Sequence, residues 1–335
     1  MNPLEALWRV RYLRNWKPDI VHTFGHRPSV SWPARFLKRW AGAPLVQDWA
    51  DLWGSGGIAE ERSWIGRRSI GKFDNGSERS FRTEADFLMV ATTHLEKLAV
   101  SWGVPIHKVR RLPPGSNSDL IRPQPRAQAK RTLGIPADAQ VLVYSGLSKF
   151  DLQYVAAVYS HIVEANSEVV LVLIGGQRLP ETLRELNGRG VGTVLPLGAV
   201  EYEDIGDLLA SGDLMLLPLS NRGFNLARFP SRVGDYLAAG RPVVTHRTGD
   251  VGEFVSQEGT GIVVDDSPRA MASAIVEILR NEAEMSAMGA RARNLAEGPW
   301  SWDRVTDQIE DCYSLALSAS MVDSDSVDSD QKKKP

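Results

Sequence analysis

The stretch of residues 229–244 constrains the fold of this chain more than any other, because it contains a complete helix-to-strand transition. Pro230 suits the first helical position, where its missing N–H would have no intrahelical partner. Gly240 is typical of a helix C-terminus, Pro242 prevents the helix from resuming, and Val243-Val244 opens a buried strand. The apolar helix face follows at the spacing i, i+3, i+4, i+7: Val233, Tyr236, Leu237 and Gly240. The stretch therefore predicts one helix–strand unit of a parallel sheet.

The same helix start carries polar residues on another face, namely Ser231, Arg232 and Asp235. This combination suits an anion with a polyol attached, because free backbone N–H groups and the positive dipole end face the anion. The carboxylate further along the helix can accept hydrogen bonds from hydroxyl groups. The alternative is an ordinary helix–strand unit whose charged side chains are solvated, and the pattern alone leaves both interpretations open.

Short apolar runs alternate with helical patterns along the rest of the chain. The predicted strands are residues 19–25, 43–50, 85–90, 109–112, 141–144, 169–174, 193–195, 214–217, 243–245 and 262–264. Helical patterns fit between them, for example at residues 203–211 and 268–280. This alternation predicts an α/β fold of doubly wound parallel sheets, whose ligands bind beyond the carboxyl ends of the strands.

A polar stretch with little periodicity, residues 116–130, is the best linker in the chain because it contains Pro123 and Pro125. We therefore predict a first domain over residues 1–122 and a second over 123–300. A last helix is expected over 301–317. The tail 318–335 is rich in Asp, Ser and Lys without a core-forming pattern, and we expect it to be disordered.

Composition excludes several classes of function. A formal charge of −2 over 335 residues gives no argument for nucleic-acid binding. The single Cys312 lies in an amphipathic pattern, so a core thiol in a reducing compartment is expected. No apolar run approaches the ~20 residues needed to cross a bilayer, and no signal peptide is evident. The six histidines lack metal-ligand spacing. These features predict a cytoplasmic protein without a metal site.

The first forty residues are locally basic, with Arg side chains interleaved with Trp from residue 8 to residue 40. Such a pattern suits peripheral contact with an anionic membrane surface at the inner membrane face. A solvated helix face with core tryptophans explains the same pattern, and both interpretations stay open. The Gly-rich loop 54–57 lacks the GxGxxG spacing and predicts a surface loop rather than a phosphate cradle.

Several short motifs along residues 18–315 together resemble the retaining glycosyltransferases of family 4, which have the GT-B fold of two Rossmann-like domains. The motifs that carry the resemblance are Pro18-Asp19-Ile20-Val21-His22, Asp51-Leu52-Trp53, Ala85-Asp86, Pro114-Gly115, Arg122-Pro123, Tyr144-Ser145-Gly146, Asp204-Ile205, Asp213, Pro218, residues 235–244, and Trp302 at the crossing helix. The resemblance implies a GT-B-like fold with an incomplete first domain, a nucleotide-sugar donor bound by the second domain, and no cofactor or metal.

Carried over by residue, the family's pair of Glu residues eight positions apart falls on Ala227 and Asp235. The resemblance implies that Asp235 binds the ribose hydroxyls, whereas Ala227 lacks the carboxylate that would hold the transferred sugar. Pro230 replaces a glycine at the helix start. The N–H groups of Ser231 and Arg232 remain to face the diphosphate, and Gly146 follows the first strand of the donor-binding domain.

The basic pair that grips the diphosphate in the family is also altered. Leu147 stands at the first position, so Lys149 is the substitute candidate, and Arg232 is the candidate for the second. A cation there would stabilise the leaving diphosphate without a metal. The histidine of the family's first domain aligns near Ala50. Asp48 or Asp51 is the candidate to accept the hydrogen bond in its place. Surface charge for the two cations and loop capping for the two aspartates are the alternatives.

The opening strand and acceptor loop of the family's first domain have no counterpart in the sequence, so we expect strand 19–24 to be an exposed edge that favours a partner. The leading hypothesis is a retaining, metal-independent transferase that moves a sugar from a nucleotide-sugar donor to a glycan or lipid acceptor of the cell envelope. The competing hypothesis is a catalytically inactive or partner-dependent nucleotide-sugar-binding subunit, favoured by Ala227 and Leu147. Sugar-nucleotide epimerisation is a third, weaker alternative.

Overall fold

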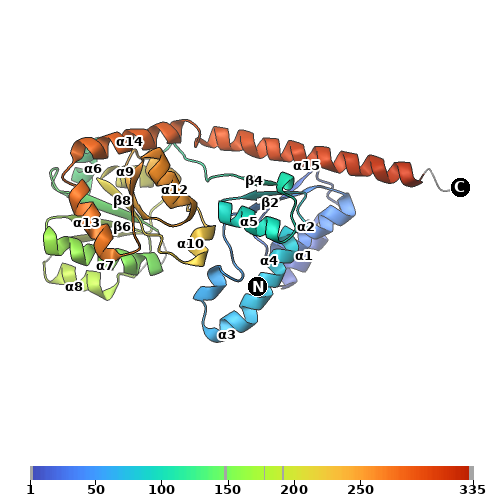
Figure 1. The fold of residues 1–335 in the computed structure, drawn as a ribbon, viewed down its shortest axis with the longest axis horizontal. Helices are drawn as coiled ribbons and strands as arrows, with labels where there is room; N and C mark the ends of the chain where they lie inside the picture. The colour runs from blue at the N-terminus through green and yellow to red at the C-terminus, as the bar shows by residue number, and fades with distance from the viewer. Residues whose placement is uncertain (1–2, 147–148, 177, 191, 332–335) are drawn as a thin grey trace. The chain divides into compact units, whose positions relative to one another are not determined.

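The computed structural model describes residues 3–146, 149–176, 178–190 and 192–331. Its contacts divide the chain into two compact units (Figure 1). Unit 1 comprises Met1–Pro113, Leu226–Arg228 and Val305–Pro335, and unit 2 comprises Pro114–Asn225 and Phe229–Arg304. This division falls between Pro113 and Pro114, earlier than the boundary proposed after residue 122, and it places most of the last helix in unit 1.

Unit 1 is a parallel α/β unit with four strands in the order β1-β2-β3-β4. The strands are β1 (Val21–Phe24), β2 (Leu45–Trp49), β3 (Phe87–Val90) and β4 (Val109–Arg111). The helices that connect or flank them are α1 (Pro3–Leu13), α2 (Pro28–Ala41), α3 (Trp64–Gly66), α4 (Lys72–Arg82) and α5 (Thr93–Ser101). Short turns of helix are η1 (Ile58–Glu61), η2 (Arg67–Gly71) and η3 (Ile106–Lys108). All four strands lie where the apolar runs predict them.

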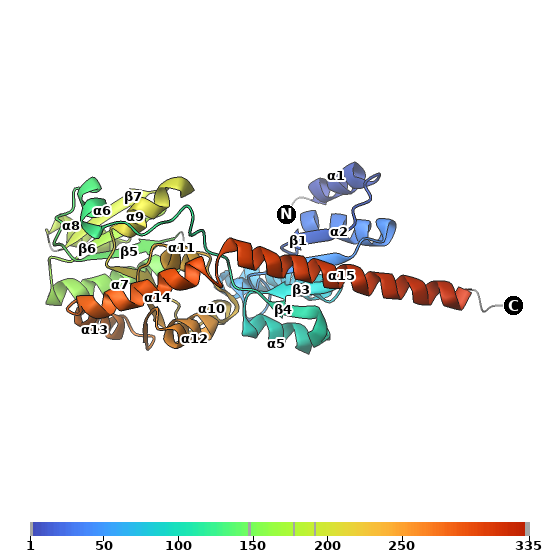
Figure 2. The same ribbon diagram turned by 90° about the horizontal axis from the view of Figure 1, so that it is seen from above.

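Unit 2 is a six-stranded parallel sheet in the order β10-β9-β8-β5-β6-β7, with helices on both faces (Figure 2). The strands are β5 (Val141–Ser145), β6 (Val170–Ile174), β7 (Thr193–Gly198), β8 (Leu214–Leu217), β9 (Val243–His246) and β10 (Gly261–Val264). The other elements of unit 2 are α6 (Arg126–Thr132), α7 (Lys149–Ala165), α8 (Glu181–Gly188), η4 (Tyr202–Asp204), α9 (Ile205–Ala210), α11 (Arg232–Ala238), α12 (Gly249–Glu258), α13 (Pro268–Ile278) and α14 (Glu282–Glu297). Two helices contain residues of both units: α10 (Gly223–Ala227) and α15 (Trp302–Gln331). The doubly wound α/β fold predicted from the sequence is confirmed.

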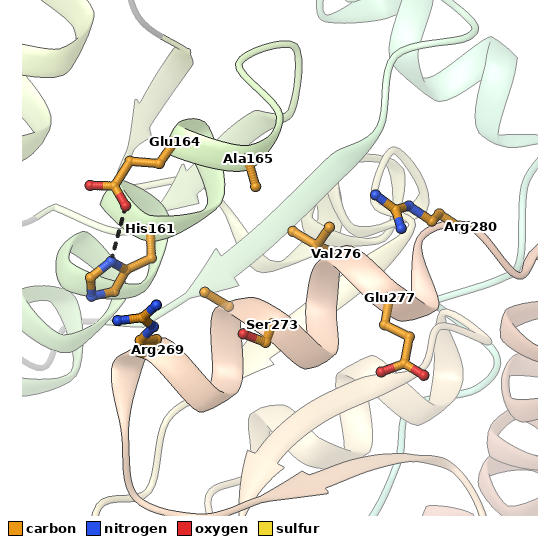
Figure 3. A pocket seen from close by; sticks show the side chains of 9 residues that line it. His161, Glu164, Ala165, Arg269, Ser273, Val276, Glu277 and Arg280 are labelled. Carbon is orange, nitrogen blue, oxygen red and sulfur yellow. Dashed lines mark hydrogen bonds and ion pairs between the residues drawn. The ribbon is translucent and has the colours of Figure 1, made fainter.

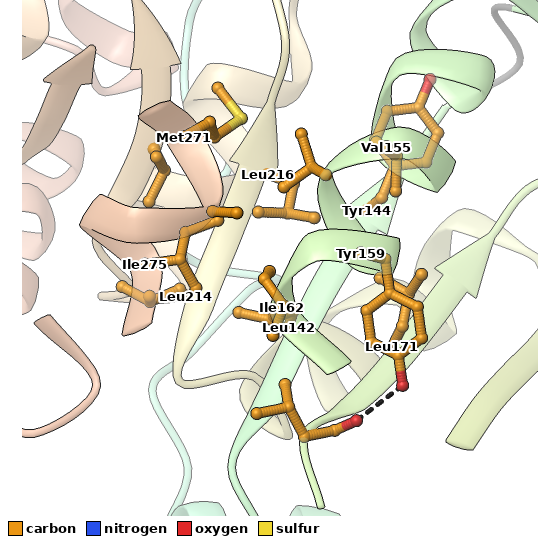
Figure 4. Packing of buried hydrophobic residues seen from close by; sticks show 14 of the residues in the cluster. Leu142, Tyr144, Val155, Tyr159, Ile162, Leu171, Leu214, Leu216, Met271 and Ile275 are labelled. Carbon is orange, nitrogen blue, oxygen red and sulfur yellow. Dashed lines mark hydrogen bonds between the residues drawn. The ribbon is translucent and has the colours of Figure 1, made fainter. Parts of the chain in front are cut away.

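The unit 2 sheet is buried on both faces, which explains why its strands read as continuous apolar runs. On one face, α7 and α13 pack Val155, Ile162 and Ile275 against side chains of β5, β6 and β8 (Figure 4). Tyr159 of α7 is buried there, and its hydroxyl donates to the carbonyl of Val169 at 2.6 Å. The partner for this buried hydroxyl removes the free-energy penalty that an unpaired polar group would carry.

Gly115 explains the Pro114-Gly115 motif in physical terms. A methyl group there would lie 2.5 Å from the Trp302 ring, and one on Gly234 would lie 2.4 Å from the Gly115 carbonyl oxygen. The segment therefore passes between α11 and the start of α15 at a distance that only glycine allows. Ser116 fixes the crossing, because its hydroxyl donates to the Gly234 carbonyl at 2.7 Å.

The last helix differs from its predicted end. α15 continues to Gln331 instead of ending at Leu317, and the disorder expected from residue 318 stays a prediction. No Gly or Pro occurs between Trp300 and Lys334 to terminate the helix. Cys312 of this helix is a buried free thiol, and burial raises its pKa to about 11, in agreement with the predicted core role.

None of the helices in the described ranges has the length and apolar character needed to span a membrane.

Candidate functional site

The carboxyl end of the unit 2 sheet has a switch point between β5 and β8, where strand order reverses. The two strands pair only at Leu142–Leu214 and Val143–Met215. Beyond these pairs the strands are bridged by Tyr236 of α11, which is fully buried. The Ser145 N–H donates to the Tyr236 hydroxyl oxygen at 3.0 Å. The apolar face predicted for this helix therefore anchors α11 across the opening where a ligand is expected.

Arg232 and Gly146, two of the predicted donor-site residues, meet at this switch point. The guanidinium donates from Nη1 to the Ser145 carbonyl at 2.8 Å and from Nη2 to the carboxylate of Asp151 at 2.9 Å. A methyl group at Gly146 would lie 2.0 Å from Nη1 of Arg232, so glycine is required for this packing. Arg232 is consequently a positioned cation rather than a mobile surface charge.

The electrostatic environment keeps Arg232 charged. Burial alone would lower its pKa, but the neighbouring Tyr236, Tyr144 and Asp151 more than offset burial, and its pKa is raised above the ordinary value. The guanidinium also lies over the Tyr144 ring, 5.3 Å from its centroid. Since an arginine has five N–H donors, two hydrogen bonds to protein leave further donors for an anion.

Asp235, the predicted ribose ligand, lies one turn further along α11 and is half-buried. Its Oδ1 accepts a hydrogen bond from the Tyr202 hydroxyl at 2.8 Å. Burial raises the pKa of Asp235, and the Tyr202 hydrogen bond partly lowers it again. The hydrogen bond from Tyr202 therefore holds one oxygen of the Asp235 carboxylate in place.

The helix start differs by two residues from the prediction. α11 begins at Arg232 with Ser231 as its N-cap, so Pro230 precedes the helix rather than opening it. The Pro230 carbonyl nevertheless accepts from Val233 N at 3.0 Å, which makes it part of the initiating turn. Lys149 is the first residue of α7, but its side chain and all of Leu147 lie outside the described residues.

The other predicted pair, Asp48 and Asp51, lies in unit 1 at the carboxyl end of β2. Both carboxylates are half-buried. Burial raises the pKa of Asp48, with Asp51 raising it further and Arg82 lowering it. Burial also raises the pKa of Asp51, whereas Arg228 lowers it. The structure therefore brings the two candidates close enough for Asp51 to raise the pKa of Asp48.

A buried polar network behind this pair was not predicted. The Glu78 carboxylate accepts hydrogen bonds from the Trp49 indole at 2.9 Å and from the backbone N–H groups of Trp53 and Gly54 at 3.0 and 2.8 Å. Arg82, one turn along α4, donates to the Asp48 carbonyl at 3.0 Å, and burial lowers its pKa to about 10. These contacts fix the loop that carries Asp51.

Ala227, which stands where the resemblance has a carboxylate, is fully buried. It packs with Trp49, Leu52 and neighbouring apolar residues of unit 1. Its carbonyl accepts a hydrogen bond from the Thr92 hydroxyl at 3.2 Å. The position is therefore part of a hydrophobic core in this chain, and a charged side chain there would be buried.

A cavity of ≈ 620 Å³ lies elsewhere, between α7 and α13 on the helical face of unit 2 (Figure 3). His161 and Arg269 face each other across it, and His161 contacts Glu164 at 3.5 Å. None of the predicted site residues lines this cavity. Its position over the sheet, rather than at the strand ends, separates it from the residues predicted to bind the donor.

Tyr202, Asp151 and Glu78 are the residues of these sites that sequence reasoning missed. Tyr202 is 33 positions from Asp235, and Asp151 is 81 positions from Arg232. No local motif connects residues so far apart. The only local signal was the i, i+4 spacing of Glu78 and Arg82 on one helix, which is also typical of a solvated face.

Two family models match the chain in sequence. Residues 1–115 match a glycosyl transferase 4-like domain, and residues 139–281 match glycosyl transferases group 1. A D-inositol 3-phosphate glycosyltransferase from Thermobispora bispora is 28% identical over 316 residues, covering 89% of this chain and 71% of that protein. A GDP-mannose-dependent alpha-(1-6)-phosphatidylinositol monomannoside mannosyltransferase from Mycobacterium tuberculosis is 30% identical over 62% of this chain and 56% of its own length.

Solved structures show the same fold at low sequence identity. Sucrose-phosphate synthase from Thermosynechococcus elongatus superposes with a TM-score of 0.76 at 19% identity, covering 95% of this chain and 78% of that one. HepE from Anabaena, solved in complex with UDP-glucose, gives a TM-score of 0.71 at 16% identity, covering 92% and 81%. With both domain models present in this order, the chain belongs to the family 4 glycosyltransferases, which have the GT-B fold.

Proposed function

We propose that this chain transfers a sugar from a nucleotide-sugar donor to a glycan or lipid acceptor, with retention of configuration and without a metal. The observation that supports the donor site is the arrangement at the β5–β8 switch point, where Arg232 lies over Gly146 and Asp235 is positioned by Tyr202. The diphosphate would contact Arg232 and the N–H groups of Ser231 and Arg232. The ribose hydroxyls would donate to the free oxygen of Asp235.

In the proposed reaction the bond between the anomeric carbon and the diphosphate oxygen breaks, and negative charge builds on the leaving phosphate. The acceptor hydroxyl oxygen bonds to the same face of that carbon, and its proton passes to the leaving phosphate. Arg232 would stabilise this charge more in the transition state than in the bound donor, which is the condition for accelerating the step. Its ion pair with Asp151 fixes the guanidinium before the donor arrives. Lys149 remains the candidate for a second cation.

Asp48 and Asp51 are proposed to accept hydrogen bonds from hydroxyl groups of the transferred sugar. They must be ionised for this role, and burial raises the pKa of both carboxylates. Activity that depends on them would therefore be lost, as the pH falls, at a higher pH than for solvent-exposed aspartates. The alternative is loop capping, which would leave turnover unchanged when either is replaced.

The competing proposal is a nucleotide-sugar-binding subunit that is inactive or depends on a partner. Ala227 favours it, because the carboxylate of the family motif is replaced by a buried methyl group. A panel of UDP and GDP sugars separates the two proposals. Turnover supports the transferase, whereas binding without hydrolysis or transfer supports the binding subunit.

Calorimetry with UDP and GDP sugars tests the donor site directly. Asp235→Ala removes hydrogen bonds to a charged acceptor, each contributing about 1.5–3 kcal/mol, so we expect nucleotide affinity to fall at least tenfold. Glu277→Ala, on α13 and away from the site, is the matched control and should bind like wild type. Equal affinity of Asp235→Ala and wild type would contradict the proposal.

Two of the relatives are named for inositol compounds, D-inositol 3-phosphate and phosphatidylinositol monomannoside. We propose an acceptor exposed at the inner membrane face to a cytoplasmic enzyme. Exposed Trp8, Tyr12 and Trp16 near the basic residues of α1 are the proposed peripheral contact. The outer edge of β1, which pairs only with β2 within the described sheet, is the proposed site for a partner strand.

A further inference from the structure

A second exposed apolar surface in unit 1 lies outside the proposed donor and N-terminal surfaces. It is formed by residues 62–73. Arg62 and Ser63 precede the helix, and α3, the π-helical turn η2 and the start of α4 then follow one another without a break. Figure 1 shows this segment extending α4 away from the β1–β4 sheet. We call residues 62–73 the basic helical extension.

Its large apolar side chains face solvent. Trp64 is 64% exposed, Ile65 70%, Ile70 47% and Phe73 48%. The inner side of the same segment is packed, since Gly71 is buried with its Cβ position 3.4 Å from Ala59. The apolar side chains are therefore not core residues of unit 1, and four exposed ones lie within ten residues of one segment.

The extension carries four cations, Arg62, Arg67, Arg68 and Lys72, and no acid. Arg68 lies over the Trp64 ring, 5.5 Å from its centroid. Arg62 pairs inward with buried Asp74 at 2.7 Å, whereas Arg67 lies 3.7 Å from Glu60 with both side chains about half exposed. Exposed Arg and Lys next to Trp, Phe and Ile match the chemistry of an anionic lipid interface.

We propose that the basic helical extension inserts its apolar side chains into an anionic lipid bilayer surface. Charge decides between this occupant and a second copy of the chain. A two-fold symmetric dimer through this surface would place the same cations against themselves, which is unfavourable, whereas anionic lipid headgroups neutralise them. The inference extends the proposed membrane contact to a different surface and does not depend on the identity of the donor.

The test is co-sedimentation of the full chain with vesicles of phosphatidylcholine alone or mixed with phosphatidylglycerol. We expect binding to the mixed vesicles that weakens with salt. Arg68→Glu with Lys72→Glu should lower the partition coefficient at least tenfold, as should Ile65→Ser with Ile70→Ser. The matched controls are Lys97→Glu with Arg189→Glu and Val100→Ser with Ile106→Ser, which change exposed residues elsewhere by the same chemistry.

Quenching by brominated lipid reports which surface inserts. We expect the quenching to decrease in Trp64→Phe and to persist in Trp8→Phe. The proposal is overturned if wild type does not bind the mixed vesicles, if the extension variants bind like the controls, or if only Trp8→Phe loses quenching. A dimer in solution that Ile65→Ser with Ile70→Ser dissociates would also overturn it in favour of self-association. Unchanged UDP- or GDP-sugar binding by the variants separates failure of this proposal from failure of the donor site.

Discussion

A methyl group added at Gly146 would lie 2.0 Å from Nη1 of Arg232 and 2.8 Å from the Tyr144 hydroxyl. Arg232 cannot move away without breaking its contacts with Ser145 and Asp151. Gly146→Ala should therefore displace the guanidinium, with an overpacking penalty of about 1–3 kcal/mol. We expect diphosphate-containing nucleotides to bind at least tenfold more weakly, as measured by calorimetry.

The control for this substitution is Gly188→Ala in α8, where nothing lies within 4 Å of the added methyl group. That variant should keep wild-type affinity. A Gly146→Ala protein that is folded and binds UDP or GDP like wild type would show that Arg232 does not contact the diphosphate.

A second prediction at the scale of single residues concerns Tyr202. Its hydroxyl hydrogen bond lowers the pKa of Asp235 and so opposes the effect of burial. In Tyr202→Phe that opposing cause is removed, so the pKa of Asp235 rises further. The ribose hydrogen bonds proposed for Asp235 require an ionised carboxylate. As the pH falls, Tyr202→Phe should therefore lose nucleotide affinity at a higher pH than wild type.

Calorimetry from pH 8 to pH 4 measures this shift, and at neutral pH the loss should be about two- to tenfold, the worth of one hydrogen bond. Asp235→Asn provides the reference, because adding Tyr202→Phe to it should not move the pH profile. An identical profile for Tyr202→Phe and wild type would mean that the hydroxyl does not position the carboxylate.

Two elements of unit 1, β1 and α15, are connected by a histidine that is neutral in the folded state. His22 of β1 contacts the Tyr313 hydroxyl of α15 at 2.8 Å, and burial lowers the pKa of His22 from 6.5 to about 4. Between these two values the unfolded chain binds more protons than the folded chain. The stability from neutral His22 is thus complete above pH 6.5 and is lost as the pH falls towards 4.

We expect this loss to amount to about 1–2 kcal/mol after allowance for partial exposure. Thermal unfolding at pH 7 and pH 4.5 measures it, and His22→Asn should unfold with a smaller pH dependence. His107→Asn, on the exposed turn η3, should keep the wild-type dependence. If both variants follow wild type, His22 does not titrate on unfolding. Burial also lowers the pKa of the fully buried His26, which adds a pH dependence of the same sign in wild type and in both variants.

Elements were predictable from sequence where their signal is local. Each strand is a short apolar run, and the α11 stretch contains its own start, buried face and stop. The errors have physical causes: the turn that begins at Pro230 precedes regular helical geometry, and the tail beyond Leu317 lacks a residue that ends a helix. Capping and helix-breaking residues define the ends of a helix less sharply than burial defines the position of a strand.

The sites were predictable only in part, because their geometry depends on contacts between distant segments. Gly146, Arg232 and Asp235 were found through motifs, but Asp151 and Tyr202, which position them, were not. Glu78 was missed for the same reason. Its backbone partners lie more than twenty residues earlier, and a glutamate on an amphipathic helix is more often solvated.

The whole molecule has separate cores in its two units. The clusters around β5 and β8 consist of unit 2 residues, and those around β2 and β3 consist of unit 1 residues. A ligand that binds only one unit should stabilise that unit by RT ln(1 + [L]/Kd), about 2.7 kcal/mol at one hundred times Kd. For a unit of this size the melting temperature would rise by roughly 5–10 °C.

We therefore expect two transitions in differential scanning calorimetry. A UDP or GDP sugar should raise the melting temperature of only one of them. Asp235→Ala should abolish that shift, because the proposed donor site belongs to unit 2. His22→Asn should alter the pH dependence of the other transition, because β1 belongs to unit 1. The two variants thus assign each transition to a unit independently. A single transition that the nucleotide raises as a whole would show that the units unfold together, since cooperative coupling spreads the binding energy over the entire chain.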